Sequence, residues 1–239
     1  MRKYYFLALI AFLGLASCRF FGKRINGNGV IKTEERPVSS FNQVDAAGNI
    51  QLIVVQGDLK PVKLEGDQNI LSYIVVNQEG DRITIKTREG VNLIPSGDLK
   101  IYVTSPTFKS IEVSGSSDII GQTKITSNDE LSLEASGSGE IKMEVDAPKI
   151  IAGISGSGSV HLKGQARDLE MNLTGAGHGY CYDLMTENTS VDISGAGSAQ
   201  VYASVKLKAD ISGAGNISYK GNAAVSQQIS GAGSVNKAD

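Results

Sequence analysis

Apolar and polar residues alternate along most of this chain, which is the pattern of β-strands that bury one face. From about residue 114 onward a short motif, Ser/Thr-Gly-small-Gly-polar, interrupts the alternation at regular intervals. Its first Gly stands at positions 115, 137, 156, 175, 195, 213 and 231, so successive copies are 18 to 22 residues apart. A period of this length indicates a protein built from stacked repeats. The residue four positions after that Gly is apolar or small in every copy: Ile119, Ile141, Val160, Gly179, Ala199, Ile217 and Val235.

A single repeat of this size cannot bury its own apolar side chains, whereas repeats stacked as parallel strands can. The pattern therefore predicts an all-β fold, a parallel β-helix (β-solenoid) with coils of about 18–22 residues. The Gly motif would form the corner of each coil, because Gly reaches positive φ without steric cost. A flexible Gly/Ser linker and a β-propeller or sandwich are the alternatives, but propeller blades need about 40 residues each.

The segment before the repeats also lacks a helical period. Short alternating runs occur at 50–54, 83–85 and 99–103, with turn signals between them. The run 70–74 fits either a short helix or a bend. We therefore predict one nearly all-β domain over residues 26–239, with larger and less regular coils toward its N-terminus.

The N-terminus has the features of an export signal. Arg2 and Lys3 precede the apolar run 6–16, which is shorter than the about 20 residues that span a bilayer. The run ends in Leu-Ala-Ser before Cys18, which resembles the lipobox of bacterial lipoproteins. We expect residues 1–17 to be a signal peptide, Cys18 to be lipidated and residues 18–25 to form a tether. A plain secretory peptide is the alternative. A lipid on Cys18 would anchor the protein to the cell envelope, most simply the outer membrane, with its periplasmic or surface side left open.

The chain resembles a known family, the auto-transporter adhesin head GIN domain family (DUF2807). The resemblance rests on the opening segment 27–41, on the run 50–57 and on the SGSG and SGAG motifs of the coils, and it covers about residues 26 to 236. Members of this family look like right-handed parallel β-helices and often carry a lipoprotein signal. The resemblance implies the fold more firmly than the function, because folds host many functions.

One outward column of the predicted coils contains carboxylates. Asp192 and Asp210 would lie on adjacent coils about 5 Å apart, where a pair could bind Ca²⁺ or act in glycoside hydrolysis. The alternative is a solvated acidic stripe that keeps the solenoid soluble. The stripe is favoured because Gly153 and Asn172 interrupt the column.

Three tyrosines give the best candidate for a binding face. Tyr180, Tyr182 and Tyr202 are expected to point outward on adjacent coils. Their rings could stack on sugar rings or dock a partner, or they could simply stack along the solenoid. Alternation places Cys181 inward, as a small apolar side chain.

The two histidines, His161 and His178, occupy non-equivalent positions and have no further ligands in the pattern, so we expect surface residues and no metal site. The formal charge of −2 and the lack of a basic run argue against nucleic acid. No catalytic constellation emerges, and we expect no cofactor. We predict a non-enzymatic, lipid-anchored adhesin that binds carbohydrate or an envelope protein. A polysaccharide lyase or hydrolase and a structural or signalling envelope protein are the alternatives.

Overall fold

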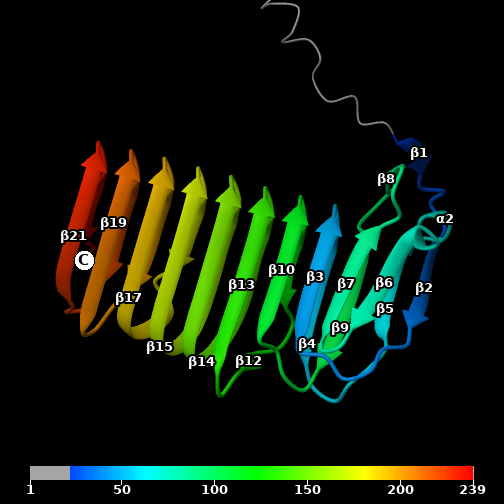
Figure 1. Ribbon diagram of the computed structural model, residues 1–239, viewed down its shortest axis with the longest axis horizontal. Coiled ribbons are helices and arrows are strands. Elements are labelled where there is room, and N and C mark those ends of the chain that lie inside the picture. Colours follow the sequence, from blue (N-terminus) through cyan, green and yellow to red (C-terminus); the bar gives the residue numbers. More distant parts are fainter. Residues whose placement is uncertain (1–21, 239) are drawn as a thin grey trace, which may run out of the picture.

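The computed structural model describes residues 22–238, and almost every element in it is a β-strand (Figure 1). From β10 onward the chain winds into stacked coils with two strand faces, and all strand pairs in this region are parallel. The prediction of an all-β fold with stacked parallel strands is confirmed. The strands of this region are β10 (Ser110–Gly115), β11 (Asp118–Gly121), β12 (Ile125–Thr126), β13 (Glu130–Gly137), β14 (Glu140–Gly156), β15 (Ser159–Gly175), β16 (His178–Cys181), β17 (Leu184–Gly195), β18 (Ser198–Tyr202), β19 (Lys206–Gly213), β20 (Asn216–Lys220), β21 (Ala224–Gly231) and β22 (Ser234–Lys237).

The Gly motif forms the corner between the two faces, as the sequence predicted. The first Gly of each copy pairs in register with the first Gly of the next, from Gly115 to Gly231. At Gly175 the backbone has φ +100°, and a Cβ added there would lie 2.6 Å from the carbonyl oxygen of Gly156. That oxygen accepts a hydrogen bond from the N–H of Ala176 at 2.8 Å. Successive corners therefore stack backbone on backbone, which leaves no room for a side chain.

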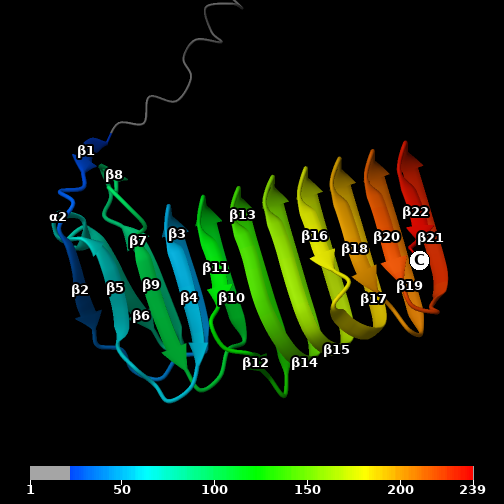
Figure 2. The ribbon, with the colours of Figure 1, turned by 180° about the vertical axis from the view of Figure 1, so that it is seen from behind.

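The N-terminal third mixes parallel and antiparallel pairs (Figure 2). The first coil continues the solenoid, because β3 pairs with β10 and β4 pairs with β11 in parallel. The coils are not purely parallel here, since β2 and β9 each pair with β5, and β6 with β7, in antiparallel fashion. The elements are β1 (Lys23–Asn26), β2 (Ile31–Arg36), β3 (Gln43–Gly48), β4 (Gln51–Gln56), β5 (Val62–Asp67), β6 (Ile74–Glu79), β7 (Arg82–Thr87), β8 (Val91–Ile94), β9 (Lys100–Ser105) and the helix α2 (Gln68–Leu71).

Two local features near the N-terminus refine the sequence interpretation. The ambiguous run 70–74 begins in the short helix α2 and continues into β6. Strand β1 begins at Lys23, inside the segment 18–25 that we expected to be a tether, and pairs with β8 in a separate two-stranded sheet. The predicted signal peptide and Cys18 lie outside the described residues.

One hydrophobic core runs between the two faces. Inward side chains of successive coils pack on one another, and Phe41 and Phe108 meet edge to face at 6.3 Å in the first coils. Cys181 is fully buried in this core, as alternation predicted, and burial raises the pKa of its thiol to about 12. Because the inward residues are held by both neighbouring coils, the outward side chains stand on a rigid support.

Candidate functional site

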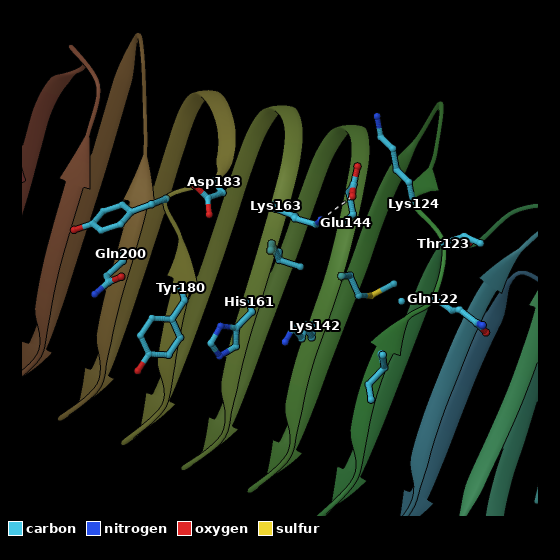
Figure 3. Close-up of a pocket in the computed structure, with 15 residues that line it drawn as sticks. Gln122, Thr123, Lys124, Lys142, Glu144, His161, Lys163, Tyr180, Asp183 and Gln200 are labelled. Atoms are coloured by element: carbon cyan, nitrogen blue, oxygen red, sulfur yellow. Dashed lines mark ion pairs between the residues drawn. The ribbon is translucent and has the colours of Figure 1, made fainter.

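A shallow hollow of about 490 Å³ lies on the face that carries β11, β16 and β18. One of its ends is formed by the loop 122–124, which follows β11, and the other by the turn after β16 (Figure 3). The floor between them consists of residues from adjacent coils, among which the side chains of Lys142, His161 and Tyr180 point outward. The lining residues are Ile120, Gly121, Gln122, Thr123, Lys124, Lys142, Met143, Glu144, His161, Leu162, Lys163, Tyr180, Tyr182, Asp183 and Gln200.

A stacked aromatic pair occupies the centre of the hollow. Strand register places Lys142, His161, Tyr180 and Gln200 in one row across four coils. The rings of His161 and Tyr180 lie with centroids 4.5 Å apart and planes 23° from parallel. Tyr180 is 38% exposed, whereas the other Tyr and Phe side chains among the described residues are buried or half-buried. The sheet thus presents an aromatic surface that a ligand can reach.

Neighbouring groups hold this pair in place. His161 Nε2 lies 3.2 Å from the carboxylate oxygen Oε1 of Glu140. On the other side His178 lies 6.2 Å from Tyr180, ring to ring, and its Nδ1 hydrogen bonds to Ser198 Oγ at 2.8 Å. The stacking of the two rings and the contact of His161 with Glu140 reduce the rotamer freedom that a ligand would otherwise have to freeze.

Most charged side chains around the His161–Tyr180 pair form ion pairs within the protein. Lys163 Nζ lies 3.0 Å from Glu144, and Lys124 Nζ lies 2.8 Å from Asp146. The hydrogen bond from Lys124 lowers the pKa of the Asp146 carboxyl, and a second one from Gln165 adds to the effect. Lys142 has no ion pair within the described residues, so its ammonium group remains available at the edge of the aromatic pair.

The three candidate tyrosines are divided between two surfaces. Tyr180 and Tyr182 both line the hollow, but the Tyr182 hydroxyl donates to Ser218 Oγ at 2.6 Å and Lys220 Nζ lies 5.1 Å from its ring centroid. Tyr202 lines a different hollow, of about 570 Å³. Tyr180 is therefore the most available of the three rings, and Tyr182 forms a wall.

The acidic pair lies away from the hollow. Asp192 and Asp210 are register partners on adjacent coils, as expected. Asp210 accepts a hydrogen bond from Lys208 Nζ at 2.6 Å, which raises the pKa of that lysine. Asp192 is exposed to solvent. Within residues 22–238 no group of three or more His, Cys, Asp and Glu side chains is arranged to hold a metal ion.

The sequence predicts His161 only as a surface residue and does not single out Lys142 or Gln200. The signal that could have found them was the repeat itself, because equivalent positions of consecutive coils become neighbours in space. Aligning the copies on their first Gly places these residues five positions beyond it, beside Tyr180. The loop 122–124 had no such signal.

Several solved structures are similar to this chain. A "putative lipid binding protein" from Parabacteroides distasonis is 25% identical with a TM-score of 0.76, and the match covers 91% of this chain and 100% of that one. A "putative adhesin" from the same organism is 26% identical with a TM-score of 0.70, over 90% and 100% of the two chains. A "putative adhesin" from Bacteroides fragilis, at 24% identity over 90% and 100% of the chains, has a TM-score of 0.83 and supports the fold.

No curated protein matches the sequence significantly. Among the described residues, no helix has the length and apolar character needed to cross a membrane. A family model does match, and it spans residues 40–223, which is most of the described chain. The chain therefore belongs to the family described as "Putative auto-transporter adhesin, head GIN domain".

Proposed function

We propose that this protein is a lipid-anchored adhesin of the cell envelope that binds carbohydrate in the hollow around Tyr180. The single observation that carries the proposal is the exposed, stacked pair of His161 and Tyr180 on a rigid sheet. Aromatic rings offer apolar area together with polar edges, and both suit the faces and hydroxyl groups of a sugar ring. Lys142 and Gln200 flank the pair in the same row and supply hydrogen-bond donors.

The proposed mechanism is recognition by a preformed surface. The parallel ladder holds the backbone of the row, and His161 and Tyr180 stack on each other, so the two rings lose little conformational entropy when a ligand binds. Repetition along the solenoid provides an extended face, which fits a chain of sugar units better than a single small molecule. The proposal includes no catalysis, because Asp192 and Asp210 lie outside the hollow and Asp210 is already paired with Lys208.

The proposed location follows from the N-terminal sequence. A signal peptide over residues 1–17 and a lipid on Cys18 would attach the protein to a membrane surface, most simply the outer membrane. Metabolic labelling with a tagged fatty acid tests this part, and the label should be absent from the Cys18→Ser variant. Labelling that persists in the variant would contradict the anchor.

A glycan array probed with the purified, fluorescently labelled full chain tests the binding function. We expect a defined group of glycans to bind, and Tyr180→Ala to weaken binding at least about tenfold, which corresponds to about 1.4 kcal/mol. Tyr180→Phe should retain most of the affinity, because it keeps the ring and its stacking on His161.

Tyr202→Ala is the matched control, since it removes an aromatic ring from the other hollow. It should leave glycan binding unchanged. A complete lack of binding across a broad array, or an equal loss for Tyr180→Ala and Tyr202→Ala, would refute the proposed site.

A further inference from the structure

A third hollow, of about 520 Å³, lies at the N-terminal end of the solenoid between β8 and the corner glycines. Figure 1 shows β8 and β1 side by side at this end, beyond β7. The hollow is separate from the glycan site, and it shares no lining residue with it. We call it the β8 groove. Its lining residues are Ala47, Gly48, Asn49, Ile50, Lys86, Thr87, Val91, Asn92, Leu93, Pro95, Leu99, Gly115 and Ser116.

The β8 groove combines an apolar wall with a single charge. Ile50, Leu93 and Leu99 contribute aliphatic side chains, and the backbone of Gly48 and Gly115 adds surface without side chains. Lys86 is the one charged residue among those that line it. An apolar groove lined by one exposed cation is complementary to an alkyl chain with an acidic head group.

A second cation lies on β1, the strand that pairs with β8. Lys23 of β1 is the register partner of Val91, which lines the groove. Register partners of a parallel pair point to the same side of the sheet, so Lys23 extends beside the groove. Neither Lys23 nor Lys86 has an ion pair within the described residues, so both remain available to an anion.

The position of β1 indicates where such a ligand would come from. An extended chain spans about 3.5 Å per residue, so Cys18 can be no more than about 18 Å from Lys23. The predicted lipid on Cys18 would therefore keep the β8 groove next to the membrane. From this we propose that the β8 groove binds an anionic lipid of the membrane, with an acyl chain along Leu93 and the acidic head group between Lys86 and Lys23. This proposal rests on the lipid anchor of the proposed function, but it does not depend on glycan binding around Tyr180.

Vesicle sedimentation of the full chain with Cys18→Ser tests the proposal, because the background substitution removes the covalent lipid. Vesicles of phosphatidylcholine alone are compared with vesicles of phosphatidylcholine mixed with phosphatidylglycerol. We expect tighter binding to the mixed vesicles, and Lys86→Glu should weaken that binding by about tenfold or more. The matched control is Lys109→Glu, an exposed lysine just before β10, at the opposite end of that strand from Gly115. It should bind like the parent.

A soluble probe tests whether the groove binds a lipid within a membrane or a free amphiphile. Titration calorimetry with dodecyl phosphate and with uncharged dodecyl maltoside, below their micelle concentrations, should show binding of the acidic probe that Leu93→Asn and Lys86→Glu both weaken. Lys86 is exposed, so its substitution keeps the test valid if Leu93→Asn fails to fold. Equal vesicle binding by Lys86→Glu and Lys109→Glu, or no preference for phosphatidylglycerol, would overturn the proposal. Binding of dodecyl phosphate without vesicle binding would overturn the membrane source.

Discussion

The stacked Gly corner makes a quantitative prediction for Gly175→Ala. The new Cβ would lie 2.6 Å from Gly156 O, which is 0.8 Å short of an ordinary 3.4 Å contact. The coils must then part at this corner, which weakens the hydrogen bonds Ala176 N–H to Gly156 O and His178 N–H to Gly158 O. Two such bonds contribute about 2 kcal/mol, and Ala at φ +100° costs about 1 kcal/mol more. We expect a loss of about 3 kcal/mol, a large part of the 5–15 kcal/mol typical of whole domains.

Substitutions at two other glycines separate the cost of the close contact between corners from the cost of Ala at positive φ. Gly80 has φ +57° and nothing within 4 Å of an added Cβ, so Gly80→Ala should cost only the backbone part, about 1 kcal/mol. Gly97 has neither positive φ nor a neighbour within 4 Å, so Gly97→Ala should change stability by less than about 0.5 kcal/mol.

The assay is urea denaturation of the full chain, followed by far-ultraviolet circular dichroism and by tyrosine fluorescence. Coincidence of the two probes checks whether the repeats unfold together, since solenoids can depart from two-state behaviour. The expected order of midpoints places Gly97→Ala near the parent, Gly80→Ala lower and Gly175→Ala lowest. Equal midpoints for Gly175→Ala and Gly80→Ala would refute the close-packed corner.

Three further predictions concern buried polar groups and the buried thiol. Hydrogen bonds lower the pKa of the buried Asp67 carboxyl below its ordinary value of 3.8. The ionised carboxylate therefore stabilises the fold fully above pH 3.8, and this stabilisation is lost as the pH falls through the folded-state pKa. Asp67→Asn should lower the melting temperature at pH 7 and flatten its dependence on acid pH, and an unchanged profile would contradict the role of Asp67. Cys181, with a pKa raised to about 12, should not react with a disulfide reagent in the folded Cys18→Ser chain and should react fully in urea, whereas rapid labelling of the folded form would disprove its burial. Thr189→Val removes the hydroxyl that donates to Tyr202 O at 2.8 Å and that hydrogen bonds with Thr186 Oγ1 at 2.7 Å, so it should cost about 1–2 kcal/mol in the same urea assay, and a gain in stability would show that these bonds are not needed.

Much of the fold was predictable because a solenoid translates sequence period directly into space. The spacing of the Gly motif fixed the coil length, and period-two alternation fixed which residues face inward, including Cys181. Each coil contacts mainly its neighbours, so no long-range pairing had to be inferred. The N-terminal third was less predictable, since the antiparallel pairs of β5 with β2 and β9 depend on contacts between segments without a shared repeat.

The candidate sites were only partly accessible from the sequence. Tyr180 was singled out correctly as an outward ring, yet its stacking on His161 follows from the coil register and from the rotamers of both rings. Tyr202 lines a different hollow from Tyr180, because the register partner of Tyr180 on the next coil is Gln200, and Tyr202 lies two residues farther along β18.

The sequence by itself determined the stacked coils, the Gly corners and the alternation of inward and outward residues, because these depend on local spacing and on the conformational freedom of Gly. Only the tertiary structure decided which outward side chains form a hollow. A hollow depends on the loops and turns that rise around a face, such as 122–124, and on strands that arrive from another part of the chain, such as β1 beside β8. Those contacts depend on packing between segments that are distant in the sequence, and the repeat pattern carries no information about that packing.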